Sequence, residues 1–135
     1  MTGFEMGMTH TGCFSEYVQV PERWIVPLPS GLSLRDAMVI GTAGFTAALS
    51  IDALESKGMT KSEQPEILVT GASGGVGSVA LRLLSQSGYK NIFALSRKKQ
   101  EERLFLSLGA KEVVYPEDVI AEKSKPLGQQ RFHYV

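Results

Sequence analysis

Short apolar runs alternate with segments of helical periodicity over the second half of the chain. The runs lie at residues 67–69, 91–95 and 112–114. The first run is apolar throughout, and the other two are apolar after one polar residue, Asn91 or Glu112. Short runs of this kind are typical of strands buried on both faces of a parallel sheet. Apolar residues recur every three or four positions between the runs, at 76–84 and 98–108, which predicts two helices. The order βαβαβ from residue 66 to 114 predicts an α/β fold, namely half of a doubly wound parallel sheet.

The two helices have predicted inward faces and predicted ends. The first face is formed by Val76, Val79, Ala80, Leu83 and Leu84, and the second by Leu104, Phe105 and Leu108. Gly88 and Gly109 follow the helices, and glycine is the usual residue where a helix ends in a left-handed turn. We expect a loop and a short helix over Pro116–Gln130, and the beginning of a fourth strand at Phe132–Val135.

The first third of the chain has a different pattern. Phe14–Val20 partly alternates between apolar and polar residues, and Trp24–Val26 is a short apolar run; both are followed by proline, which predicts two small strands. Ser33 then stands three residues before Asp36, so we expect Ser33 to cap a helix that begins near Leu34.

Two glycines interrupt that helix. Gly41 and Gly44 are costly inside a helix, whereas Phe45–Glu55 again has apolar residues at helical spacing. Because the residues at the break are small, we expect another part of the protein to approach closely there.

Composition narrows the class of protein. The 135 residues are 43% hydrophobic, which is enough for one packed domain, and 14 basic residues balance 14 acidic ones. Without a run of one sign, neither nucleic-acid nor membrane-surface binding is indicated. Cys13 is the single cysteine, the two histidines are far apart, and neither a zinc site nor a signal peptide is recognisable. No stretch approaches the roughly 18 apolar residues of a membrane span, so we expect a cytoplasmic protein that acts on small molecules.

A glycine-rich turn follows the first buried strand. Gly71, Gly74, Gly75 and Gly77 allow a sharp turn and leave room for a ligand, and the free N–H groups of the next helix would face its phosphates. A P-loop requires Gly-Lys-Ser/Thr, and here Ser78 and Val79 follow the last glycine, which disfavours ATP. A purely structural turn is the alternative to dinucleotide binding.

The residues after the second strand indicate which dinucleotide is bound. An NAD enzyme usually has Asp or Glu there to bind the ribose hydroxyls, whereas this chain has Ser96, Arg97, Lys98 and Lys99. A hydroxyl and a guanidinium suit a 2′-phosphate, so NADPH is favoured over NADH. The alternative is that the basic residues are only the solvated start of the next helix. Glu101 and Glu102 would partly neutralise them.

The glycine turn also matches that of short-chain dehydrogenases, but those enzymes begin with this turn and carry Tyr-x3-Lys, which is missing here. Together with residues 12–18 and 39–49, residues 69–78 instead resemble the medium-chain dehydrogenase/reductase superfamily, in its zinc-independent quinone oxidoreductase and acrylyl-CoA reductase branch. Zinc-dependent relatives have a cysteine ligand near the position of Thr42. The resemblance implies that residues 1–40 end a GroES-like substrate domain and that residues 41–135 begin an NADP-binding Rossmann domain. Family members are longer at both ends, so we expect an internal fragment.

The same resemblance implies the binding residues. Thr42 and Thr46 would lie near the nicotinamide, Ser73, Gly74, Gly75 and Val76 would hold the pyrophosphate, and Ser96 and Arg97 would hold the 2′-phosphate.

The resemblance also implies the activity. The parent would be a homodimeric oxidoreductase that transfers hydride from NADPH to an activated alkene such as acrylyl-CoA, or to a quinone. No catalytic residue is assigned. The alternatives are an NADP(H)-binding module without catalysis, or an inactive piece that is ordered only by pairing with another chain.

Overall fold

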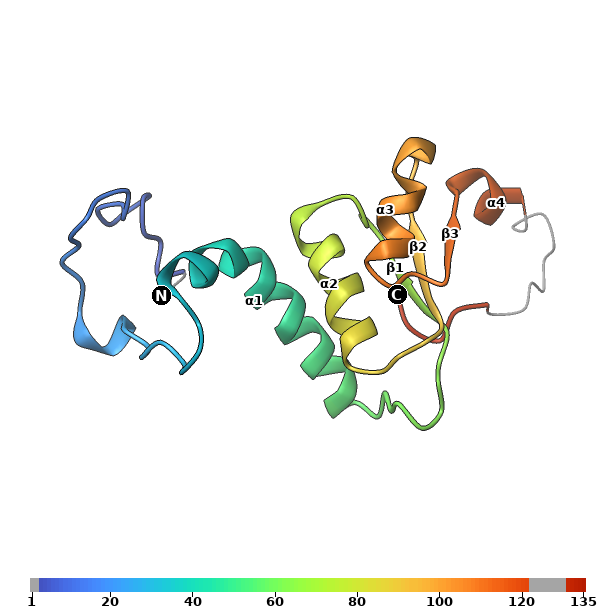
Figure 1. Cartoon of the computed structure of the whole chain (residues 1–135), viewed down its shortest axis with the longest axis horizontal. Helices are drawn as coiled ribbons and strands as arrows, with labels where there is room; N and C mark the ends of the chain where they lie inside the picture. The colour runs from blue at the N-terminus through green and yellow to red at the C-terminus, as the bar shows by residue number, and fades with distance from the viewer. Residues whose placement is uncertain (1–2, 122–130) are drawn as a thin grey trace. The chain divides into compact units, whose positions relative to one another are not determined.

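The computed structural model describes residues 3–121 and 131–135, which form two compact units (Figure 1). The first unit is Met1–Thr42 and the second is Ala43–Val135. The helices are η1 (Glu22–Trp24), α1 (Leu34–Ser56), α2 (Gly75–Gln86), η2 (Lys99–Glu101), α3 (Glu102–Ser107) and α4 (Pro116–Ala121), where η marks a 3-10 helix. The strands are β1 (Ile67–Val69), β2 (Ile92–Leu95) and β3 (Glu112–Val114).

The second unit contains a parallel sheet with the strand order β1-β2-β3. Leu68 is paired with Phe93, and Ala94 with Val113, so the predicted βαβαβ order is confirmed. Tyr134 forms a parallel bridge with Ile67 on the other edge of β1. The predicted fourth strand therefore begins beside β1, as a single bridge.

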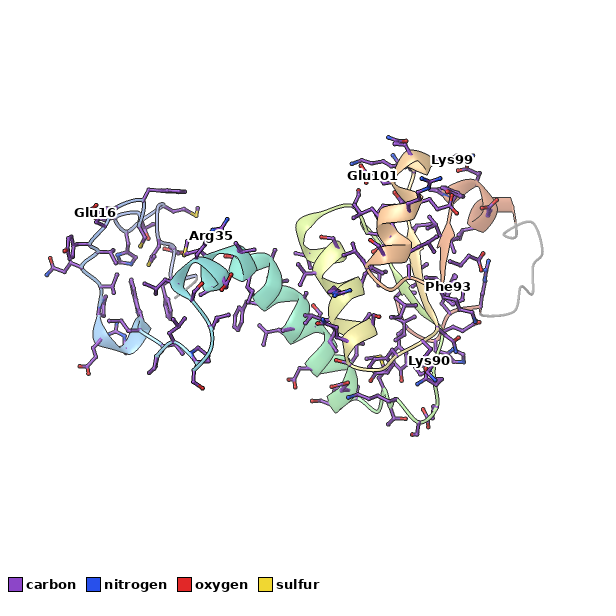
Figure 2. All side chains as sticks on the ribbon, viewed as in Figure 1. Glu16, Arg35, Lys90, Phe93, Lys99 and Glu101 are labelled. Atoms are coloured by element: carbon purple, nitrogen blue, oxygen red, sulfur yellow. The ribbon has the colours of Figure 1, made fainter. Side chains whose placement is uncertain are left out.

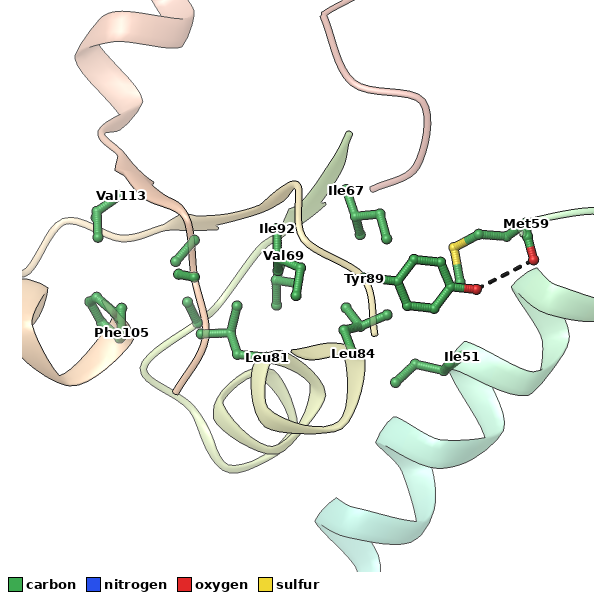
Figure 3. Packing of buried hydrophobic residues seen from close by; sticks show 13 residues of the cluster. Ile51, Met59, Ile67, Val69, Leu81, Leu84, Tyr89, Ile92, Phe105 and Val113 are labelled. Atoms are coloured by element: carbon green, nitrogen blue, oxygen red, sulfur yellow. Dashed lines mark hydrogen bonds between the residues drawn. The ribbon is translucent and has the colours of Figure 1, made fainter. Parts of the chain in front are cut away.

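Alternate residues of the strands bury themselves on opposite faces of the sheet. Ile67, Val69, Ile92, Ala94 and Val113 pack with Ile51 of α1, with Leu81 and Leu84 of α2 and with Phe105 of α3 (Figure 3). Leu68, Phe93 and Val114 face the other way and pack with Val119 of α4 and with Phe132. Helices thus cover both faces, which explains why the strands are apolar at every position except the exposed Glu112 at the start of β3.

The predicted glycine stops of α2 and α3 are confirmed. Gly88 has φ 100° and Gly109 has φ 108°, in the left-handed region. The N–H of Tyr89 donates to the Leu84 carbonyl (3.1 Å), and the N–H of Ala110 donates to the Phe105 carbonyl (3.0 Å). These bonds satisfy carbonyls that the helix ends would leave unpaired.

The prediction that Leu104 faces inward from the helical segment at residues 98–108 is wrong. Phe105 is fully buried and Leu108 packs beside the core, but Leu104 is 50% exposed. The segment begins with the 3-10 turn η2, so its rotation differs from that of a continuous α-helix. The six-residue helix α3 that follows has Phe105 as its buried residue.

The start and the interruption of α1 agree with the sequence. The N–H of Asp36 donates to Ser33 Oγ (3.1 Å), and Gly41 has the non-helical angles φ 49° and ψ −156°. By length and composition alone, α1 is long and apolar enough to cross a membrane. The prediction that no stretch of the chain approaches the length of a membrane span is therefore wrong for this helix. Gly41 divides it, however, and the longer helical part runs only from residue 42 to residue 56.

The two small strands predicted for the first unit are not formed. Residues 14–20 have no regular structure, and Trp24 belongs to η1. Trp24 is buried by stacking on Phe4, with the ring centroids 4.7 Å apart. A strand requires a neighbour to accept its ladder hydrogen bonds, and the described part of this unit has only the isolated bridge between Met6 and His10.

Candidate dinucleotide-binding site

The candidate site lies where β1 ends and the chain turns into α2. Gly71 follows with φ 61°, and the N–H of Gly74 donates to its carbonyl oxygen (2.8 Å), which closes a tight turn. The turn lies between β1 and α2, at the carboxyl end of β1. Crevices at the carboxyl ends of strands, where the strand order reverses, are the usual ligand sites of open parallel sheets.

Gly77 is held against this turn by close backbone packing. A Cβ atom on Gly77 would overlap the Gly71 carbonyl oxygen and would lie 2.8 Å from its carbonyl carbon and 3.0 Å from the Cα of Ala72. The helix can approach the turn this closely only because residue 77 has no side chain.

The first turn of α2 offers backbone N–H groups to a ligand. Its N-cap, Gly74, makes no side-chain capping bond. Within the described residues, the amides of Gly75, Val76 and Gly77 have no backbone acceptor. Ser73, Gly74, Gly75 and Val76 are all exposed. Unpaired N–H groups at the positive end of a helix dipole suit a phosphate or another anion.

Small residues of α1 lie against the same turn. The Cβ of Ala43 is 3.4 Å from the position that a Cβ on Gly75 would take, and Gly44 and Ala47 are buried. The close approach that the sequence predicts at the helix break is therefore made, within the second unit, by the glycine turn.

An open groove of about 500 Å³ extends from this turn within the second unit. Its lining includes Ser50 and Leu54 of α1, Thr70 after β1, Val76 of α2, and Val135. Thr46 is exposed on α1, and its carbonyl accepts from Ser50 Oγ (2.9 Å). Thr42 is exposed and is the last residue of the first unit. The placement of both threonines near a nicotinamide stays a prediction.

Ser96 lies at the carboxyl end of β2. It is 7% exposed, its N–H donates to the Val114 carbonyl (3.2 Å), and its Oγ accepts from the N–H of Lys98 (3.1 Å). The hydroxyl hydrogen can still be donated to a ligand. Arg97 is exposed, and no carboxylate in the described part of the chain pairs with it.

The two lysines that follow have acidic neighbours. Lys98 Nζ is 3.0 Å from Glu101 Oε1, which confirms that Glu101 partly neutralises the basic cluster. Lys99 Nζ is 3.4 Å from Glu117 Oε1 and 5.0 Å from the ring centroid of Tyr115. Figure 2 shows Lys99 and Glu101 at the end of the sheet opposite Lys90, which precedes β2.

Tyr115 and Glu117 are neighbours of the site that sequence reasoning missed. They follow β3, whose carboxyl end lies at the same edge of the sheet as Ser96. A backbone hydrogen bond and Lys99 lower the pKa of Glu117, while burial and Glu102 raise the pKa of Tyr115. Their position directly after the third strand of a parallel sheet was the available signal.

Chemically, the site is a backbone cradle for phosphate with a hydroxyl and a guanidinium at the next strand end. The described residues contain no group of three His, Cys, Asp or Glu side chains that could hold a metal ion. A parallel sheet with a glycine turn of this geometry defines a dinucleotide-binding fold of the Rossmann type.

Comparison with known proteins shows which oxidoreductases this chain resembles. It is 45% identical over 131 residues to YhfP of Bacillus subtilis, which carries a provisional quinone oxidoreductase name, and 42% identical over 127 residues to the acrylyl-CoA reductase AcuI of Ruegeria pomeroyi. These alignments cover 97% and 94% of the chain, and 39% and 38% of the two relatives. No protein-family model matches the chain.

Solved structures agree with the sequence relatives. The structure of YhfP with NAD bound superposes with a TM-score of 0.85, covering 95% of this chain and 38% of that one. The YhdH oxidoreductase of Salmonella enterica in complex with NADP is 46% identical and gives a TM-score of 0.84, over 96% of this chain and 39% of that one. The chain thus spans about two fifths of the length of its relatives. It is homologous to the quinone oxidoreductase and acrylyl-CoA reductase branch of the medium-chain dehydrogenase/reductase superfamily.

Proposed function

We propose that this chain forms the dinucleotide-binding part of an NADPH-dependent oxidoreductase that reduces an activated double bond, such as that of acrylyl-CoA, or a quinone. The single observation that carries the proposal is the packed glycine turn. Its exposed amides at the start of α2 face the same edge of the sheet as Ser96 and Arg97. The homology to AcuI and YhfP supports the reaction class.

The residues present fit a dinucleotide. Gly77 keeps α2 against the turn, and in the described part of the chain no side chain caps the helix at Gly74, which suits a pyrophosphate held by Ser73, Gly74, Gly75 and Val76. A bulkier residue at position 77 would fill the space that the turn needs.

Ser96 and Arg97 would select the phosphorylated cofactor. YhfP was solved with NAD and YhdH with NADP, so relatives of nearly equal similarity do not decide the choice. In this chain an exposed guanidinium without a carboxylate partner in the described residues stands beside a buried hydroxyl that can donate. That pair suits a 2′-phosphate, whereas an NAD enzyme usually has Asp or Glu directly after the second strand, where this chain has Ser96 and Arg97.

Bound NADPH would supply the hydride for the reduction. The residues of this chain would fix its position through the turn and the 2′-phosphate, and Thr42 and Thr46 would border the nicotinamide. Positioning the cofactor against an electrophilic alkene is the main contribution of the protein in such chemistry. No residue of the chain is assigned as the proton donor.

The proposal includes the domain organisation. Residues 1–40 would close a GroES-like substrate domain, and residues 41–135 would begin the NADP-binding domain; the division into Met1–Thr42 and Ala43–Val135 supports a boundary there. The small-molecule substrate follows from the named activity of AcuI. A homodimer and a cytoplasmic location stay predictions.

The test is a calorimetric titration of Arg97→Ala with NADPH and with NADH. Loss of a charge-assisted phosphate contact is expected to weaken NADPH binding about 10- to 100-fold and NADH binding less than twofold. Arg82→Ala is the matched control, because Arg82 is exposed on α2 and its removal should change neither affinity. Equal weakening of both nucleotides by Arg97→Ala would contradict the assignment of the 2′-phosphate to this residue.

A further inference from the structure

Three consecutive cations follow Ser96, but their surroundings differ. Lys98 Nζ is paired with Glu101 at 3.0 Å, and Lys99 Nζ with Glu117 at 3.4 Å. Within the described residues only Arg97 of the three has no acidic partner. The local sequence therefore has more positive charge than the folded loop offers to a ligand.

The pairing of Lys98 is tied to the shape of the loop. Its N–H donates to Ser96 Oγ (3.1 Å), which fixes its backbone two residues from the proposed phosphate position. Glu101 is the last residue of η2, and its N–H donates to the Lys98 carbonyl (3.1 Å), so the 3-10 turn holds the two residues together. The Glu101 side chain is 29% exposed and that of Lys98 is 50% exposed.

A carboxylate in this position opposes binding of a 2′-phosphate in two ways. It holds the Lys98 ammonium in an ion pair, and it adds a negative charge near the incoming dianion. NADH has a neutral hydroxyl at the same place and meets neither effect. The penalty therefore applies selectively to the phosphorylated cofactor.

We infer that Glu101 is a specificity-determining residue that limits the preference for NADPH over NADH by withholding Lys98 from the 2′-phosphate. This rests on the proposed function, because it concerns the same cofactor site. Ser96 and Arg97 select the phosphorylated cofactor, and Glu101 sets how strong that selection is.

The test is calorimetric titration of Glu101→Gln, which keeps the size of the side chain and removes its charge. We expect NADPH binding to tighten about three- to tenfold at low ionic strength, with a change of less than twofold for NADH. The gain should shrink as salt is added, because ions screen exposed charges.

Glu102→Gln is the matched control. Glu102 is the next residue and loses the same charge, but its Oε2 accepts from the Tyr115 hydroxyl (3.3 Å) and it pairs with neither lysine. The Glu102→Gln variant should therefore keep the ratio of NADPH affinity to NADH affinity within about twofold of the wild-type ratio. An equal gain in Glu102→Gln would mean that net charge acts, and would contradict the specific role of Glu101.

Two other results separate this inference from the proposed function. If wild-type protein prefers NADPH and Glu101→Gln leaves that affinity unchanged or weakens it, the role of Glu101 is wrong while the cofactor site stands. If the wild-type chain binds neither nucleotide, the proposed function and this inference both fail.

Discussion

The carbonyl oxygen of Gly71 occupies the position that a Cβ atom on Gly77 would require, so the turn after β1 and the first turn of α2 fit together only with glycine at residue 77. The atoms that such a Cβ would meet all belong to the backbone of Gly71 and Ala72, so no flexible side chain can move aside to relieve the overlap. The geometry of the proposed phosphate cradle therefore depends on this pair.

Gly77→Ala is expected to lower the free energy of unfolding by roughly 1–3 kcal/mol, the usual cost of forcing a methyl group into packed structure. Chemical denaturation measures the change. The same variant should lose NADPH binding, because α2 must shift away from the turn. Gly75→Ala is the control for stability, since its Cβ would make an ordinary contact, 3.4 Å from Ala43. Equal stability of Gly77→Ala and wild type would contradict the packing described for the turn.

Tyr89 makes the protein sensitive to high pH. Its hydroxyl donates to Glu55 Oε1 (2.8 Å) and lies 3.4 Å from the Met59 carbonyl oxygen (Figure 3). Burial and then Glu55 raise the pKa of Tyr89 from 10.0 to about 12. The unfolded chain loses the proton at lower pH than the folded chain, so this contribution to stability is complete below pH 10 and is lost between about pH 10 and pH 12.

The measurement is the free energy of unfolding of wild type and Tyr89→Phe from pH 8 to pH 12. Tyr115 also has a raised pKa and contributes to both proteins, so the difference between the two curves isolates Tyr89. The wild-type advantage should fall across the upper part of the range. A constant difference would show that the hydroxyl of Tyr89 does not titrate as described.

Gln64 joins the loops that precede β1 and β2. Its Nε2 donates to the carbonyls of Lys61 (2.7 Å) and Gly88 (3.1 Å), and its Oε1 accepts from the N–H of Lys90 (2.8 Å). Gln64→Ala is expected to cost about 0.5–1.5 kcal/mol in the free energy of unfolding, because it removes hydrogen bonds to exposed backbone groups that water can then satisfy in part. Gln86→Ala, on the exposed face of α2, should cost less than about 0.5 kcal/mol. A similar decrease in the free energy of unfolding in both variants would show that the hydrogen bonds of Gln64 do not stabilise these loops.

The sequence was sufficient for the parts of the fold that are encoded locally. The run at residues 67–69 is buried on both faces, and Gly88 and Gly109 adopt the left-handed angles that end helices. A strand that is buried on both faces can be recognised from an unbroken apolar run, and a position with positive φ can be recognised from glycine. The strands expected at 14–20 and 24–26 failed because a strand depends on a neighbour, which a local pattern does not reveal.

For the candidate site, too, the contacts between residues close in sequence could be predicted, and the contacts that depend on the sheet could not. The pairing of Lys98 with Glu101 lies within one helical turn and was foreseeable from spacing, whereas the pairing of Lys99 with Glu117 depends on β3 lying beside β2. The overlap between Gly71 and a Cβ on Gly77 likewise depends on how the helix approaches the turn. Residue type indicated the chemistry, and only the fold shows which charges are already paired.

The most direct measurement is a calorimetric titration of the wild-type 135-residue chain with NADPH and, separately, with NADH. Saturable binding that is at least about tenfold tighter for NADPH is the expected result, because the turn serves both cofactors and Arg97 serves only the phosphorylated one. Binding of neither nucleotide, or equally tight binding of both, would contradict the assignment of an NADPH site to this chain.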